Sequence, residues 1–173
     1  MLKIIARTLL KGPTTETAPP ASDAAIAELG RQVDALARKR LGHSLTIREV
    51  DAGSCNGCEL EIHAINNAFY DLERFGIKFA ASPRHADVLL VTGPVTRNMK
   101  IALERTYAAT PAPKWVVAVG DCASNGGIFA GGPGVAGGVS DVLPVDLHIA
   151  GCPPTPLQLL GGLLALLEAN IRV

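Results

Sequence analysis

The sequence lacks an excess of charge of either sign. Its 173 residues include 16 Lys and Arg and 16 Asp and Glu, so the formal net charge is zero. Proteins that bind nucleic acid need a basic patch or stripe, whereas the basic residues here are scattered along the chain. We therefore exclude nucleic acid as a partner.

Charged residues are also few, and the sequence has no apolar run that could cross a bilayer. Charged residues make up 18% of the chain, and the mean hydropathy is +0.27. A free soluble domain usually carries more surface charge, so we expect partners to cover part of the surface. The longest uncharged stretch, residues 147–167, contains three prolines, which leaves an apolar helix of about eleven residues where a membrane span needs roughly 20.

The N-terminus shows no signal sequence. Lys3, Arg7 and Lys11 interrupt what would have to be an unbroken apolar segment of about 7–15 residues. We therefore expect the chain to stay in the cytoplasm. On a helix these cations would share one face of residues 1–11, which predicts a small basic amphipathic element. It would either meet a membrane surface or membrane subunit, or be a frayed terminus.

Composition divides the chain into two parts. Residues 12–22 are rich in Pro, Thr and Ala and predict a linker, because three prolines remove backbone donors. Asp23 is predicted to cap a helix that ends near Gly42. The first part, residues 1–43, holds the amphipathic element, the linker and this helix; the second, residues 44–173, is an α/β domain.

Strand-like and helical segments alternate in the second part. Strands are predicted at residues 44–50, 77–81, 87–92, 114–120 and 146–150, and helices at residues 59–75, 99–106 and 156–170. Two strands, DVLLVT and KWVVAVG, are continuously apolar, as expected when both faces of a parallel sheet are covered. The alternation predicts an α/β fold with a doubly wound, flavodoxin-like, mainly parallel sheet, helices on both faces and an N-terminal helical extension.

The four cysteines offer the most distinctive chemistry. In a reducing compartment they are more readily explained as metal ligands than as two disulfides. Each follows a predicted strand: Cys55 and Cys58 the first, Cys122 the fourth and Cys152 the fifth. The carboxyl ends of parallel strands share one sheet edge, where ligand sites of open α/β sheets form. We therefore expect the four thiols to meet.

Four thiolates suit either a tetrahedral zinc ion or an iron–sulfur cluster. Structural zinc sites usually use two short C-x-x-C pairs, whereas here one pair is joined by two single cysteines from separate loops. Glycines stand beside the cysteines in GSCNGC, GDC and GCPP, where backbone N–H groups can approach the sulfurs. These features favour a cubane cluster, with structural zinc and a dithiol or free-thiol arrangement as the alternatives.

Four runs of sequence carry a family resemblance. They are REVDAGSCNGCELEI, ASPRHADVLLVTGPVTRNM, VAVGDCASNGGIF and PVDLHIAGCPPTP, in that order. From about Leu41 to the C-terminus, the chain resembles the small, cluster-bearing subunit shared by NiFe hydrogenases and respiratory complex I, of the 20-kilodalton type. Its C-x-x-C pair resembles membrane-bound, energy-converting hydrogenases of the formate hydrogenlyase type, whereas complex I carries adjacent cysteines there. Residues 130–138 depart from the family, which commonly has a tyrosine-containing stretch at this point.

The resemblance implies one 4Fe-4S cluster, held by Cys55, Cys58, Cys122 and Cys152 beside the catalytic site of a large partner subunit. It implies an electron-transfer subunit of a membrane-associated hydrogenase, a multi-subunit oxidoreductase in which this chain is not catalytic alone. A quinone-linked, complex I-like subunit of the NADH-quinone oxidoreductase type is the second hypothesis, and a zinc-stabilised scaffold is the third. The implied partners are the large catalytic subunit, a ferredoxin-like iron–sulfur subunit and membrane subunits, which would hold the chain on the cytoplasmic face of the inner membrane.

Two charged residues are candidates for tuning a reduction potential or coupling proton movement. Glu59 opens the helix after Cys58, where it either interacts with the helix dipole or also faces an anionic cluster. For Arg84, the resemblance suggests a guanidinium near the cluster or a buried carboxylate, and an exposed ion pair is the alternative. His63 and His85 are predicted to be solvated, and we exclude both as metal ligands.

Overall fold

The computed structural model describes residues 22–169, and the predicted amphipathic element at residues 1–11 lies outside the described residues, as does the linker up to residue 21. Five strands form the central sheet: β1 (Thr46–Asp51), β2 (Lys78–Phe79), β3 (Val88–Thr92), β5 (Trp115–Val119) and β7 (Leu147–Ile149). Their order is β2-β1-β3-β5-β7, and each neighbouring pair is parallel. The chain thus runs outward from β1 to β2 and then returns to the other side of β1, which is the flavodoxin-like order predicted from the sequence.

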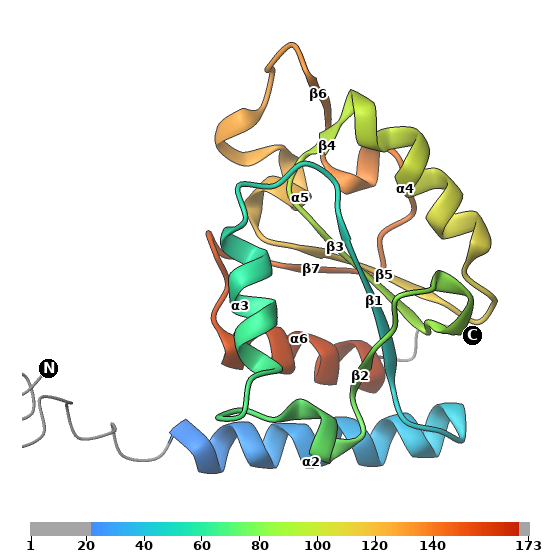
Figure 1. Ribbon diagram of the computed structural model, residues 1–173, viewed down its shortest axis with the longest axis vertical. Helices are drawn as coiled ribbons and strands as arrows, with labels where there is room; N and C mark the ends of the chain where they lie inside the picture. Colours follow the sequence, from blue (N-terminus) through green and yellow to red (C-terminus); the bar gives the residue numbers. More distant parts are fainter. Residues whose placement is uncertain (1–21, 170–173) are drawn as a thin grey trace, which may run out of the picture.

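Helices cover both faces of this sheet (Figure 1). On one face lie α2 (Ser22–Leu41), α3 (Gly57–Ile65) and α6 (Pro156–Glu168), and on the other lie α4 (Arg97–Ala109) and α5 (Asp121–Asn125). Neighbouring residues of the central strands alternate between the two cores: Leu90 packs toward α6, whereas Leu89 and Val91 pack toward α4. This two-sided burial explains why the strand sequences are continuously apolar.

The last helix, α6, contributes much of the first core. Pro156 opens it, and its cap is reciprocal: the Thr155 hydroxyl accepts from the backbone N–H of Gln158 at 3.4 Å, while Gln158 Oε1 accepts from the backbone N–H of Thr155 at 2.8 Å. Five leucines of α6 are buried, and the helix packs against α2. Within residues 22–169, α6 and every other helix is too short or too polar to span a membrane.

Truncating Leu160 to alanine is expected to destabilise the fold by about 2–5 kcal/mol, because this side chain is fully buried and a cavity would replace it. The matched control is Leu157→Ala on the same helix, whose side chain is 40% exposed. Urea unfolding of the purified chain measures both free energies. Equal losses for the two variants would contradict this assignment of the core.

The predicted helix at residues 59–75 is wrong in its second half. The helix α3 ends at Ile65, and only a single 3₁₀ turn, η1 (Leu72–Phe75), follows. The Asn67 side chain accepts backbone N–H bonds at 2.8 and 3.1 Å from the residues two and three positions on, which replaces the helical pattern by an Asx turn. Asp71 then adopts a left-handed conformation, with φ of 45°, so the helix cannot continue.

Other boundaries differ less from the predictions. The first helix already includes Ser22 and ends at Leu41, and Gly42 follows with φ of +76° as its stop.

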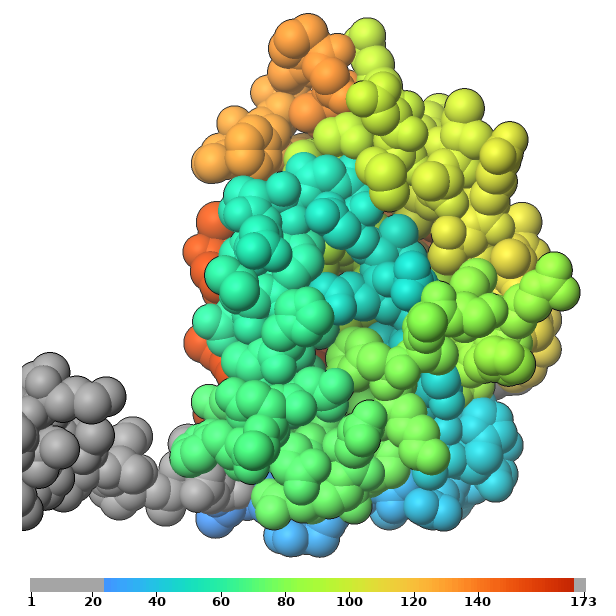
Figure 2. All heavy atoms as spheres, in the orientation of Figure 1, coloured from blue at the N-terminus to red at the C-terminus, as the bar shows by residue number. Residues whose placement is uncertain are grey.

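The sequence does not predict α5 or the antiparallel pair β4 (Val95–Thr96) and β6 (Val135–Gly137), because elements this short show no periodicity. Three further 3₁₀ turns are η2 (Pro83–His85), η3 (Gly127–Phe129) and η4 (Val139–Asp141). The orange segment around β6 protrudes from the body of the molecule (Figure 2).

Candidate metal centre

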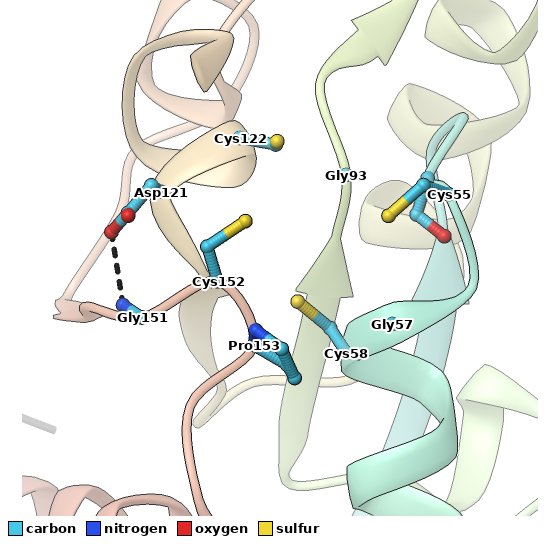
Figure 3. Close-up of a pocket in the computed structure, with 10 residues that line it drawn as sticks. Cys55, Gly57, Cys58, Gly93, Asp121, Cys122, Gly151, Cys152 and Pro153 are labelled. Atoms are coloured by element: carbon cyan, nitrogen blue, oxygen red, sulfur yellow. Dashed lines mark hydrogen bonds between the residues drawn. The ribbon is translucent and has the colours of Figure 1, made fainter. Parts of the chain in front are cut away.

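The four cysteines lie on three loops at the carboxyl edge of the sheet. Cys55 and Cys58 follow β1, Cys122 lies in α5 directly after β5, and Cys152 follows β7. Figure 3 shows their sulfur atoms turned toward one shared hollow, which is partly open and has about 380 Å³ of empty space when the open solvent at its mouth is included. The structure therefore brings together residues that are up to 97 positions apart in the sequence.

The hollow has a closed side and an open side. All four cysteines are free thiols; Cys122 is buried, Cys58 is partly buried, and Cys55 and Cys152 are exposed. A bound group would therefore be enclosed by α5 and the start of α3. It would remain accessible past the loops that carry the two exposed cysteines.

Two glycines let the backbone come very close to the sulfur atoms. A Cβ atom on Gly120 would lie 2.6 Å from Cys58 Sγ and 3.2 Å from the carbonyl oxygen of Gly151. A Cβ atom on Gly127 would lie 2.7 Å from Cys122 Sγ. Both glycines have positive φ values, +85° and +50°, which side-chain-bearing residues rarely adopt. The cradle around the thiols is thus built from backbone, and the backbone N–H of Ile128 bonds to the Cys122 thiol there.

Carboxylates fix the loops that carry the cysteines. Asp51, at the end of β1, accepts backbone N–H bonds from Gly53 at 2.7 Å and Ser54 at 2.8 Å, which shapes the turn before Cys55. Asp121 and Gly151 exchange two bonds of 2.9 Å: the backbone N–H of Asp121 donates to the Gly151 carbonyl, and Asp121 Oδ1 accepts from the Gly151 N–H (Figure 3). The loops of Cys122 and Cys152 are therefore tied directly to each other.

Electrostatics in the hollow disfavour thiolates unless positive charge is supplied. Burial raises the pKa of the Cys58 thiol to about 12, and negative charge on Glu59 and the other three cysteines contributes in the same direction. Burial also raises the pKa of Cys122, against the effect of a bond from the Ile128 backbone N–H. Metal binding requires deprotonated sulfur, so a cationic metal core is the group whose charge offsets both effects.

In the chain purified without metal, iodoacetamide is expected to modify Cys152 faster than Cys58. Only the thiolate reacts, and Cys58 is both less exposed and held protonated by its raised pKa. Peptide mapping by mass spectrometry at about pH 8 measures the two rates, and denaturing urea should remove the difference. Equal rates in the folded chain would contradict this description of the hollow.

Among residues 22–169, no three His, Cys, Asp or Glu side chains come close enough together to hold a single ion. A tetrahedral zinc ion with Zn–S bonds of about 2.3 Å needs sulfur atoms roughly 3.8 Å apart. A cubane, in which each thiolate binds a different iron, holds its four cysteines around a larger core.

The other candidate residues do not line the hollow. Glu59 is 6% exposed, and neither carboxylate oxygen has a hydrogen-bond partner among the described residues. Arg84 is exposed in η2, before β3, and therefore lies toward the opposite edge of the sheet from the cysteines. His63 and His85 are exposed too, and His63 borders a separate hollow with Glu49. The structure thus groups the cysteines without these four residues.

Sequence reasoning missed two residues that shape the site. Asp121 was visible in GDC, but only the structure reveals its two bonds to Gly151. Gly93 follows β3 and contributes no thiol, yet a Cβ atom there would lie 2.5 Å from the backbone of Ser54. A glycine directly after a buried strand was the available signal for such a close approach.

Known proteins match most of the described chain. Residues 55–166 match the family model described as "NADH ubiquinone oxidoreductase, 20 Kd subunit". Over 137 residues the chain is 47% identical to formate hydrogenlyase subunit 7 of Escherichia coli (strain K12), covering 78% of this chain and 54% of that protein. The chain thus spans about half the length of that relative. It is also 45% identical over 130 residues to a probable membrane-bound hydrogenase subunit of Pyrococcus furiosus, covering 75% of this chain and 78% of the relative.

A solved structure agrees with these relatives. A chain of the membrane-bound sulfane sulfur reductase, described as an archaeal respiratory membrane complex, superposes with a TM-score of 0.65 at 38% identity. The match covers 79% of this chain and 74% of that one. By sequence and by fold, the chain belongs to the family of the 20 Kd subunit of NADH ubiquinone oxidoreductase, as the four sequence runs predicted.

Proposed function

We propose that this chain is an electron-transfer subunit of a membrane-associated hydrogenase complex, and that Cys55, Cys58, Cys122 and Cys152 hold one 4Fe-4S cluster. The observation that carries the proposal is the set of four free thiols that face one hollow from three loops. The glycine cradle supports it, because a cluster needs close backbone as well as four thiolates. The names of the two relatives, a formate hydrogenlyase subunit and a probable membrane-bound hydrogenase subunit, favour the hydrogenase branch.

The residues around the hollow have distinct tasks in this proposal. A bound cluster would supply reversible storage of one electron. The four thiolates would bind it. The paired bonds between Asp121 and Gly151 would hold the loops of Cys122 and Cys152 in a fixed position relative to each other. Burial around Cys122 and Cys58 would exclude water from one side, which protects the group and tunes its potential.

Turnover of hydrogen or quinone must take place on a partner. The whole sequence contains four cysteines, so none remains to bind nickel or a second cluster. We propose a large catalytic subunit, a ferredoxin-like iron–sulfur subunit and membrane subunits as partners, with the chain on the cytoplasmic face of the inner membrane. Exposed apolar residues close to the cysteine loops suit such contacts: Leu60 is 60% exposed, Ile128 82% and Leu157 40%.

A quinone-linked, complex I-like role is the second candidate, and the family description itself favours it. The C-x-x-C spacing of Cys55 and Cys58 favours the hydrogenase branch, because complex I has adjacent cysteines at this point. Glu59 and Arg84 remain proposals for tuning or proton coupling. The buried, unpartnered carboxylate of Glu59 gives it the stronger case.

Isolation of the intact complex through a tag on this chain separates these functions. A hydrogenase complex should contain nickel and evolve hydrogen from a low-potential donor. A complex that lacks nickel and reduces quinone would contradict the hydrogenase hypothesis and support the complex I-like one. A complex that has neither activity and that carries zinc on this chain would support the third hypothesis, a zinc-stabilised scaffold.

A further inference from the structure

An exposed histidine, which does not line the hollow, links the elements that carry Cys122 and Cys152. His148 lies on the edge strand β7, four residues before Cys152. Its register partner is Ala118 of β5, which packs into the core beside α5, so His148 lies on the α5 face of the sheet. Its ring contacts Ser124 of α5 through Nδ1 at 3.2 Å and Ser140 of η4 through Nε2 at 3.2 Å.

The hydrogen bonds of Ser124 fix the direction of this chain of contacts. The Ser124 hydroxyl donates its proton to the backbone carbonyl of Gly120 at 3.3 Å. In the tautomer that matches this bond, Ser124 accepts from His148 and the ring proton lies on Nδ1. In the same tautomer, Nε2 accepts from the hydroxyl of Ser140. Three hydrogen bonds thus run from Ser140 through His148 and Ser124 to Gly120. In each of them the donor is the group farther from Gly120 and the acceptor is the group nearer to it.

Gly120 is the residue at which this chain of bonds reaches the metal centre. It lies against Cys58 Sγ, as the 2.6 Å separation from a Cβ atom built there shows, and it is two positions before Cys122. Its own N–H donates to the Ile149 carbonyl at 2.7 Å, which joins it to the strand that leads to Cys152. The position of Gly120 therefore bears on three of the four cysteines.

We propose that His148 is a positioning residue that acts through Ser124 and Gly120 to raise the reduction potential of the metal centre. The inference rests on the proposed cluster. Reduction adds negative charge to the metal centre. The aligned bonds have their positive ends toward Gly120, which lies against Cys58 Sγ, so they stabilise the reduced state. Without the Nδ1 donor, Ser124 loses its partner and the dipoles no longer add, so the potential falls.

The test compares variants of the anaerobically purified complex by redox titration monitored by EPR. His148→Ala is expected to keep full iron and sulfide and to shift the cluster midpoint to a lower potential. His148→Asn should return it toward the parent value, because an Asn amide nitrogen lies where Nδ1 does and still reaches Ser124. His148→Gln, whose amide matches Nε2, should stay low. Ser140→Ala, which removes only the outermost bond, should shift the midpoint least.

The outcomes separate this inference from the proposed function. If the parent complex contains no iron and sulfide on this chain, the proposed function fails and the inference fails with it. If the parent carries the cluster and His148→Ala titrates at the parent potential, the inference alone is overturned. Should His148→Ala fail to assemble, the Asn and Gln variants decide: a higher potential for Asn supports the inference, and equal potentials overturn it.

Discussion

Replacing Cys122 by alanine is expected to abolish the EPR signal of the reduced cluster in the isolated complex. Cys122 is the most buried of the four thiols, and no other cysteine in the sequence is available to replace it. Each iron of a cubane takes one cysteine, so loss of one ligand leaves an iron open to water and the cluster prone to loss. EPR of the dithionite-reduced complex, with iron analysis of the same sample, measures the effect.

The matched control separates loss of a ligand from loss of stability. Val88 is fully buried at the start of β3, at the opposite end of the strand from the cysteine edge. Val88→Ala is expected to cost about 2 kcal/mol of folding stability and to keep the signal. If Cys122→Ala retained a full signal, Cys122 would not be a ligand.

Substituting Gly120 by alanine is expected to lower both cluster occupancy and folding stability. The new Cβ atom would lie 2.6 Å from Cys58 Sγ, well inside van der Waals contact. The backbone itself, at φ of 85° and ψ of 163°, lies in a region that essentially only glycine adopts, which alone costs about 1–3 kcal/mol. Iron content per chain and urea unfolding of the purified chain measure the two effects.

The same substitution in α6 provides the control for Gly120→Ala. Gly161 lies inside this helix, and a Cβ atom there would have no neighbour within 4 Å. Gly161→Ala should therefore stabilise the chain by about 0.5–1 kcal/mol through the higher helix propensity of alanine, with iron unchanged. A Gly120→Ala variant that bound iron as the parent does would contradict the close approach of this loop to Cys58.

The order of strands and cysteines made the sheet and the grouping of the thiols predictable. Continuous apolar runs such as DVLLVT identified the parallel strands, because both faces of β3 are buried. Each cysteine follows a strand, and parallel strands end at one edge, so the grouping of Cys122 with Cys152 followed from topology. A strand or helix was thus predictable wherever its local sequence pattern agreed with its burial in the folded chain.

Features that depend on single side-chain contacts could not be predicted. The apolar spacing continues past Ile65, but two backbone N–H groups bond to the Asn67 side chain and end the helix. The bonds between Asp121 and Gly151 join loops 30 residues apart, and nothing local indicates them. The link from His148 to Ser124 likewise forms only when β7 and α5 are folded together.

The most direct test of the account is a determination of iron, acid-labile sulfide and zinc in the anaerobically purified complex, with the metal of this chain assigned by comparison with its Cys122→Ala variant. We expect the variant to lose about four iron and four sulfide per complex relative to the parent, together with one cluster signal in EPR. Loss of one zinc with no change in sulfide would contradict it.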